Sequence, residues 1–250
     1  MRIILVFLFL VFFYIISIPM WIIAFFIGLQ DKDARHRFSQ PFVNIGFKGI
    51  LFFSGVKLTV RGKENQPKGA ALYTFNHRGF FDIITGYVTA PELSLYVAKK
   101  ELKNIPLVSR WMRFMHCLFL DRGDLRQGME TISKGIELLK TGHSIYIAPE
   151  GTRAKTDEML PFHEATFRLA LKSKAPIVPV AIVNTAPVFE DHLPWVKPQH
   201  IIFEYMEPID VNELSKEEKK CIGATVHDII QAKVNENLAE LEAEKKARVA

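Results

Sequence analysis

Cysteine is scarce in this chain of 250 residues, which contains only Cys117 and Cys221. Two cysteines are too few for a disulfide framework, so we expect a reduced domain that faces the cytosol. The eight histidines include no His-x3-His pair, and no Cys-x2-Cys pair occurs, so the sequence predicts no metal site. A Gly-x-Ser-x-Gly elbow is also missing, which argues against a serine nucleophile of the hydrolase type.

A strong excess of charge is missing too. Lysine and arginine total 32 against 27 acidic residues, a formal net charge of +5. The basic residues are spread along the chain and form no recognisable nucleic-acid module, so we expect no nucleic-acid partner. A modest positive charge suits anionic lipid head groups or phosphorylated substrates.

No charged residue occurs between Ile3 and Leu29. A helix of that length reaches about 40 Å, which exceeds the roughly 30 Å hydrocarbon core of a bilayer. A secretory signal peptide fits less well, because the apolar run is longer than a usual h-region and no small-x-small cleavage site follows it. Pro19 is expected to kink this helix or divide it into two pieces.

Basic side chains flank the apolar run unequally. Only Arg2 precedes it, whereas several charged or titratable residues follow it, namely Asp31, Lys32, Asp33, Arg35, His36 and Arg37. The positive-inside bias then places the following domain on the cytoplasmic face of the cell membrane. A second apolar stretch, residues 42–56, is too short and too polar to span comfortably and is predicted to be an interfacial helix. We therefore predict membrane-anchoring helices over residues 1–56 and a folded domain over 57–250, and the sequence leaves open whether the anchor spans the bilayer or sits in one leaflet.

Strand-like runs and helical periods alternate from Lys57 onward. Seven strands are predicted, at residues 57–61, 70–75, 93–98, 117–120, 144–148, 177–183 and 200–205. Helices are predicted at residues 83–89, 107–115, 125–140, 162–174 and 215–250. This alternation predicts an α/β fold with a mixed, mostly parallel central sheet flanked by helices.

The segment Asn76–Asp82 places a histidine and a carboxylate five residues apart, directly after an apolar strand. On a regular helix the side chains of His77 and Asp82 would point about 140° apart, so they meet only where the chain turns sharply. Gly79 permits such a turn. The pair then resembles a general base with the carboxylate that orients it. The alternative is a solvated loop histidine, with Asp82 acting as a simple helix cap.

Three further blocks carry charged residues or proline at the ends of apolar strands. They are Phe-Leu-Asp-Arg at residues 119–122, Ala-Pro-Glu-Gly-Thr-Arg at 148–153 and Ile-Val-Pro-Val at 177–180. Together with Asn76–Asp82, and in this order, they resemble the four motifs of the glycerolipid acyltransferases, in particular the 1-acylglycerol-3-phosphate acyltransferases. The resemblance covers about residues 57–210, and its specific element is His-x4-Asp followed by Glu-Gly-Thr-Arg. His116 and the residues after His77 depart from the usual pattern and leave the identity of the acceptor open.

The resemblance implies an enzyme of phospholipid biosynthesis that transfers a fatty acyl group to the free hydroxyl of 1-acyl-sn-glycerol 3-phosphate and so makes phosphatidic acid. The acyl donor, acyl-CoA or acyl carrier protein, is a co-substrate, and no other cofactor is expected. His77 would activate the hydroxyl for direct attack and Asp82 would orient His77. The implied substrate-binding residues are Lys99, Arg122, Glu150, Gly151, Thr152 and Arg153.

The cationic residues among these have a second interpretation, as surface ion-pair partners of nearby acids. Guanidinium groups such as Arg122 and Arg153 nevertheless suit a phosphate, which they can bind with two parallel hydrogen bonds. In open α/β sheets ligands bind beyond the carboxyl ends of strands, and these residues follow such ends, so we expect them to face one cleft with His77.

Other functions remain open on the sequence. The same chemistry could act on glycerol 3-phosphate or another lysophospholipid, or the base could activate water in a lipase-type hydrolase. A non-catalytic protein that binds anionic membrane lipids fits less well, because binding alone has no use for an oriented base. The acyl-chain length, the donor type and the oligomeric state are not determined by the sequence.

Overall fold

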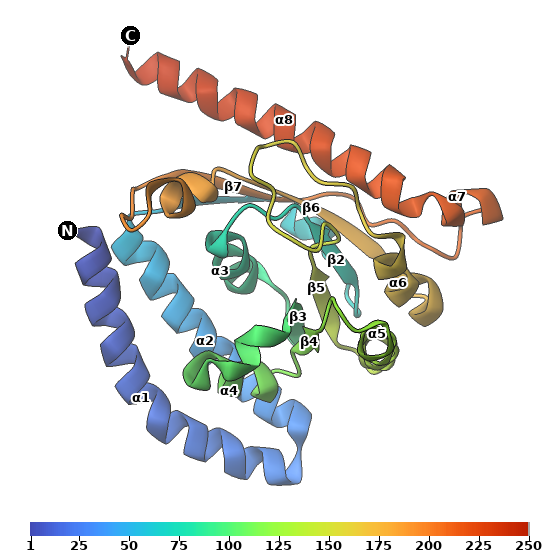
Figure 1. The fold of residues 1–250 in the computed structure, drawn as a ribbon, viewed down its shortest axis with the longest axis horizontal. Coiled ribbons are helices and arrows are strands. Elements are labelled where there is room, and N and C mark those ends of the chain that lie inside the picture. Colours follow the sequence, from blue (N-terminus) through green and yellow to red (C-terminus); the bar gives the residue numbers. More distant parts are fainter. Residues whose placement is uncertain (250) are drawn as a thin grey trace.

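A seven-stranded sheet forms the centre of the computed structural model, which describes residues 1–249 (Figure 1). The strands are β1 (Lys57–Arg61), β2 (Leu72–Phe75), β3 (Ser94–Lys99), β4 (Leu118–Leu120), β5 (Ser144–Ile147), β6 (Ile177–Val183) and β7 (His200–Tyr205). Their order is β1-β7-β6-β2-β5-β3-β4, and every neighbouring pair is parallel except β6 with β7. The predicted mixed, mostly parallel sheet is confirmed.

The central strands are apolar because both of their faces are covered. Every residue of β2, β5 and β6 is buried, which is typical of parallel strands that lie between helices. On one side, the rings of Tyr73 and Tyr146 stack with centroids 4.3 Å apart. The packed sheet therefore fixes the positions of its strand ends, and it also positions the side chains that directly follow those ends.

Helices pack on both sides of the sheet. They are α3 (Phe80–Thr89), α4 (Pro106–Phe114), α5 (Leu125–Lys140), α6 (Arg168–Ser173), α7 (Lys216–Lys220) and α8 (Ile222–Val249), with short 3-10 helices at Lys63–Asn65, Lys100–Asn104, Glu164–Phe167, Ala186–Val188 and Glu190–His192. Helix α8 runs along β6 and β7 on the side opposite to α3 (Figure 1). The helix expected over 162–174 is wrong in its first half, which forms a 3-10 helix instead, and the one expected over 215–250 is divided at Cys221.

An antiparallel pair of long helices precedes the sheet (Figure 1). Helix α1 (Arg2–Gln30) continues through Pro19 as one helix, so the expected division is wrong, and α2 (Lys32–Ser54) begins ten residues earlier than the predicted interfacial helix. Asp31 starts α2 because its side chain accepts a hydrogen bond from the Asp33 N–H at 2.7 Å.

The surface of α1 is mostly apolar and exposed. Only four of its residues are buried, Val6, Ser17, Trp21 and Ala24, and by length and composition it could cross a membrane. The pair is tied to the rest of the chain through α4, since Trp111 packs against both Trp21 and Phe42. The first strand of the sheet begins at Lys57, just after the pair ends.

Candidate active site

His77 and Asp82 meet where β2 turns into α3. His77 Nδ1 lies 2.8 Å from Asp82 Oδ2, so the turn that the sequence required between them is present. The His77 side chain is 20% exposed, whereas Asp82 is completely buried. With its proton on Nδ1, the ring presents Nε2 as a free base, and no group in the described part of the chain hydrogen-bonds that nitrogen.

The Asp82 carboxylate is held by four donors. Oδ2 accepts from His77 Nδ1 at 2.8 Å and from the backbone N–H groups of Arg78 and Gly79 at 2.7 Å each, and Oδ1 accepts from Thr185 Oγ1 at 2.5 Å. These four hydrogen bonds hold the carboxylate in one orientation beside the His77 ring. Asp82 can therefore orient the imidazole and stabilise the imidazolium that proton transfer creates.

The loop after β5 fixes the backbone of His77 on both sides. Glu150 Oε1 accepts from the His77 N–H at 2.7 Å, and the Ala154 N–H donates to the His77 carbonyl at 2.8 Å. The other oxygen of Glu150 accepts from the Leu160 N–H at 2.8 Å. Burial raises the pKa of Glu150, against the opposing effect of these hydrogen bonds. The observed partners of Glu150 are backbone groups, so its carboxylate shapes the loop beside His77, and binding of the acceptor by Glu150 stays a prediction.

Gly151 and Thr152 shape the same loop. Gly151 has a φ of 70°, in the left-handed region that favours glycine, and its N–H closes a turn onto the Ala148 carbonyl at 3.1 Å. Thr152 is exposed next to it. Gly151 therefore acts through the backbone, and Thr152 is open to solvent on the outer side of the turn.

Arg153 lies beside the start of α3. Its guanidinium carbon is 4.7 Å from the centroid of the Phe80 ring, and one of its nitrogens is 3.4 Å from Glu190 Oε1. The same Glu190 oxygen accepts from the Phe80 N–H at 2.6 Å. With 45% of its side chain exposed, Arg153 is a cation near His77 that remains open to solvent.

Lys99 and Arg122 follow the carboxyl ends of β3 and β4. Because β2, β5, β3 and β4 are neighbours and parallel, these two residues, His77 and Glu150 all lie along one edge of the sheet. Lys99 is 58% exposed and its Nζ is 3.3 Å from Glu101. Arg122 is exposed, and within residues 1–249 no hydrogen bond or ion pair holds its side chain. The strand spacing places β4 about 14 Å from β2, so Arg122 is the most distant of the predicted cations.

Two other residues of the motifs have structural roles. Asn76 exchanges two hydrogen bonds of 2.8 Å with the backbone of Ile182, so its amide joins the end of β2 to β6. Pro179 lies within β6, between β2 and β7.

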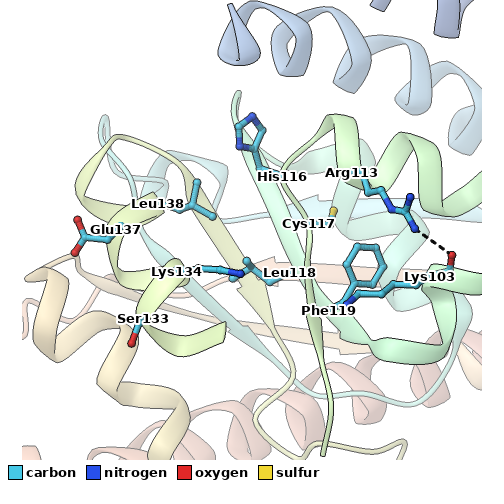
Figure 2. Close-up of a pocket in the computed structure, with 10 residues that line it drawn as sticks. All are labelled: Lys103, Arg113, His116, Cys117, Leu118, Phe119, Ser133, Lys134, Glu137 and Leu138. Atoms are coloured by element: carbon cyan, nitrogen blue, oxygen red, sulfur yellow. Dashed lines mark hydrogen bonds between the residues drawn. The ribbon is translucent and has the colours of Figure 1, made fainter. Parts of the chain in front are cut away.

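A surface hollow beside β4 lies away from this site (Figure 2). Leu118 and Phe119 form its apolar base, and Lys103, Arg113 and Lys134 bring cations to it. Figure 2 shows the Arg113 guanidinium donating to the Lys103 carbonyl, at 3.4 Å. None of the predicted site residues lines this hollow.

Two residues of the site, Thr185 and Glu190, were not predicted from the sequence. Both come from the segment after β6, more than 100 residues from Asp82, and no local pattern links them to it. The sequence also predicted no metal site, whereas the structure gathers His36, His116 and His143 with one ligand nitrogen each within 4.8 Å of one another. Regular spacing reveals paired histidines within one helix or strand, but these three histidines come from separate segments of the chain.

Comparison with known proteins places this site in a family. A family model described as Acyltransferase matches residues 57–183, just over half of the chain. The 1-acyl-sn-glycerol-3-phosphate acyltransferase of Saccharomyces cerevisiae is 33% identical over 167 residues, and that of Limnanthes douglasii is 27% identical over 187 residues. These alignments cover 65% and 72% of this chain, but only 55% and 64% of those proteins.

The fold has a solved counterpart. The crystal structure of the 1-acyl-sn-glycerophosphate acyltransferase PlsC from Thermotoga maritima matches with a TM-score of 0.76 at 24% identity, over 96% of this chain and 98% of that one. The matched family model spans β1 to β6, which contain the His77–Asp82 pair and the loop that holds it. The chain belongs to the acyltransferase family.

Proposed function

We propose that this chain transfers a fatty acyl group from an acyl thioester to the free hydroxyl of 1-acyl-sn-glycerol 3-phosphate and so forms phosphatidic acid. The observation that carries the proposal is the His77–Asp82 pair, in which a completely buried carboxylate orients an imidazole that keeps one nitrogen free. The curated relatives named for this reaction supply the substrate class.

The reaction proceeds by direct transfer. His77 Nε2 takes the proton of the acceptor hydroxyl while the hydroxyl oxygen attacks the thioester carbonyl carbon. The carbon–sulfur bond then breaks, and the imidazolium returns the proton to the departing thiolate. Asp82 stabilises the imidazolium between these two steps. The proton of the hydroxyl thus ends on the thiol, the electron pair of the carbon–sulfur bond leaves with the sulfur, and no acyl-enzyme forms.

Arg153 binds the phosphate of the acceptor, and Lys99 and Arg122 extend the positive edge toward β4. Guanidinium suits phosphate because it offers parallel N–H donors. Glu150 and Gly151 keep the loop closed onto the backbone of His77, and Thr152 stands at the rim of the acceptor site. No other cofactor takes part, and the donor is acyl-CoA or acyl carrier protein.

Residues 1–56 seat the enzyme in the membrane and residues 57–250 form the catalytic domain on the cytoplasmic face. The exposed apolar surface of α1 supports this division, and so does the excess of basic residues after it. A membrane seat gives the site direct access to an amphipathic acceptor that partitions into the bilayer.

The test is acyl transfer by the purified full-length chain in detergent. The acceptors are 1-acyl-sn-glycerol 3-phosphate, glycerol 3-phosphate and a panel of other lysophospholipids, each offered with acyl-CoA and with acyl carrier protein, and products are identified by mass. Phosphatidic acid formed by the wild-type chain supports the proposal. Free fatty acid as the main product, or another acceptor preferred by more than about tenfold, contradicts it.

A further inference from the structure

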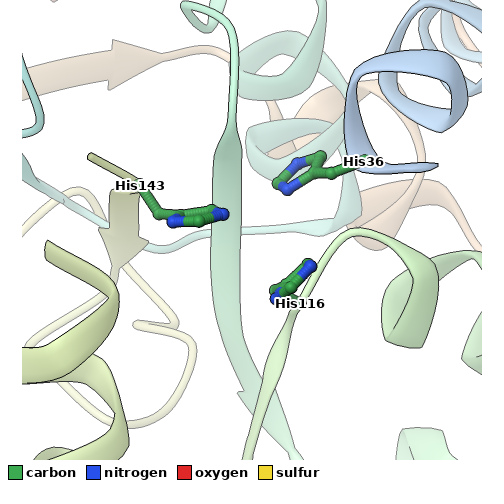
Figure 3. Close-up of side chains that lie close together, drawn as sticks. All are labelled: His36, His116 and His143. Carbon is green, nitrogen blue, oxygen red and sulfur yellow. The ribbon is translucent and has the colours of Figure 1, made fainter. Parts of the chain in front are cut away.

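Three histidines gather at the amino ends of β3, β4 and β5 (Figure 3). His143 directly precedes β5, His116 lies two residues before β4, and His36 of α2 reaches the first residue of β3 through a contact of 3.1 Å between its Nε2 and the Ser94 carbonyl. The strands are parallel, so this edge is opposite to the one that carries His77. The group, here called the histidine cluster, therefore takes no part in acyl transfer.

The spacing of the histidine cluster is that of metal ligands. The ring centroids are 5.0, 5.6 and 5.7 Å apart, and three imidazoles around a tetrahedral zinc ion with Zn–N bonds of about 2.0–2.1 Å have centroids about 5 Å apart. Figure 3 shows the three rings lying close together around a common space. One nitrogen of each ring lies within 4.8 Å of those of the other two. Small movements of the side chains would bring all three within bonding distance of one zinc ion.

The two ring nitrogens of His36 have the surroundings expected for a metal ligand. Its Nε2 faces the Ser94 carbonyl, and its Nδ1 is completely buried without a hydrogen-bond partner among residues 1–249. A metal-bound histidine typically donates its other N–H to a backbone carbonyl in this way. A buried nitrogen without a partner is otherwise costly.

Asp33 places a carboxylate oxygen beside two of the three rings. Its Oδ1 lies 3.1 Å from His143 Nε2 and 3.7 Å from His116 Nε2. Adjacent ligand atoms around tetrahedral zinc are about 3.3–3.4 Å apart, a value that falls between these two distances. His143 has a further contact on its other ring nitrogen, Nδ1, at 3.3 Å from Thr141 Oγ1.

We propose that His36, His116, His143 and Asp33 bind one zinc ion, which fastens helix α2 to the amino edge of the sheet. His36 and Asp33 come from α2, and the two other ligands come from the sheet, so the ion bridges the helical pair and the catalytic domain. Three imidazoles and a carboxylate suit zinc better than magnesium or calcium, which prefer oxygen ligands. His116 also lines the surface hollow of Figure 2, which gives the ion an access path.

The test uses the full-length chain without a histidine tag, purified in detergent and stripped with a chelator. It is then equilibrated with zinc chloride, and bound metal and thermal unfolding are measured. In a parallel sample, cobalt chloride replaces zinc, because tetrahedral Co2+ has an intense visible absorption. We expect one zinc ion per chain, a tetrahedral cobalt spectrum and a higher Tm with zinc than without it.

Two variants and a control locate the ion. His116→Asn removes the most exposed of the three histidines, and asparagine tolerates the φ of 58° at that position. It should weaken zinc binding by at least about 100-fold and abolish the zinc-dependent rise in Tm. Asp33→Asn, at an exposed position, serves if His116→Asn does not fold, and it should weaken zinc binding by about tenfold. The control, His227→Asn on α8, should bind zinc as the wild type does.

The proposal is overturned if the wild-type chain retains no more zinc than His116→Asn, if cobalt gives an octahedral spectrum, or if zinc leaves the Tm unchanged. These outcomes do not depend on acyl transfer, so the zinc site and the proposed function stand or fall separately.

Discussion

The two edges of the sheet both pair histidine with aspartate, but they do so in opposite ways. At the carboxyl edge the aspartate is completely buried and the imidazole is partly exposed. At the amino edge the Asp33 side chain is 38% exposed, and the histidines His36 and His143 are buried. The carboxyl edge leaves the His77 ring partly exposed to solvent. The amino edge encloses His36 Nδ1, which has no hydrogen-bond partner in the described part of the chain.

This difference shows that surroundings decide what a histidine beside a carboxylate can do. Asp82 has four donors and fixes one ring for proton transfer. Asp33 contacts two rings of a converging group, which suits a shared ion. The experiments below test the contrast, beginning with the largest expected effect.

Asp82→Asn should lower kcat by about 10³-fold, because the amide can neither fix the His77 tautomer nor stabilise the imidazolium. Zinc binding should be unchanged, since the substitution lies at the other edge. Steady-state kinetics and metal content of the same preparation check both statements. Asp228→Asn, at a position 84% exposed, is the control. A kcat within tenfold of the wild-type value would mean that Asp82 does not support catalysis, which would contradict the proposed contrast between the two edges.

Arg153→Gln should raise KM for the phosphorylated acceptor by about 10- to 100-fold, because a charge-assisted hydrogen bond to phosphate is lost. The KM for the acyl donor should change little. The control, Arg126→Gln, alters a side chain 89% exposed on α5. Equal changes in both KM values would argue against a phosphate role for Arg153.

Gly79→Ala should lower kcat by about tenfold through misplacement of the His77 turn. An added Cβ would lie 2.5 Å from Glu190 Oε2, so the carboxylate that accepts from the Phe80 N–H must move. Gly128→Ala is the matched control, because the nearest atom to its added Cβ is 3.8 Å away. If both substitutions leave kcat unchanged, the contact with Glu190 does not position the site.

Glu190→Gln should change the pH dependence of stability slightly. Burial, aided by the charge of Asp82, raises the pKa of Glu190 above its ordinary value of 4.5. The folded state then binds this proton more tightly than the unfolded state, so the free energy of unfolding declines as the pH rises from 4.5 through the raised pKa. Urea unfolding from about pH 4 to 8 should give a flatter curve for Glu190→Gln. The exposed control Glu64→Gln should follow the wild type, and a variant curve identical to it would contradict the prediction.

Local patterns predicted most of the fold. The helix at Leu125–Lys140 has the expected bounds, because its apolar stripe, the Asp124 cap and the turn at Thr141–Gly142 agree with one another. All seven strands lie where apolar runs between turn residues placed them. The division of α1 that was predicted as one effect of Pro19 does not occur, since the structure keeps that helix continuous.

The parts that the sequence did not reveal depend on contacts between distant segments. Thr185 reaches Asp82 across 103 positions, and His36 joins His116 and His143 from a different helix. His116 adopts a φ of 58° just before β4, and no sequence pattern predicts that conformation. Such positions are set by tertiary packing and leave no periodic pattern in the chain.

The most direct measurement is kcat for His77→Ala with 1-acyl-sn-glycerol 3-phosphate, alongside thermal unfolding and the control His227→Asn. A general base contributes about 10²- to 10⁴-fold to a rate, so we predict a loss of about 10³-fold or more with an unchanged unfolding temperature. A folded His77→Ala variant whose kcat stays within tenfold of the wild type would contradict the account.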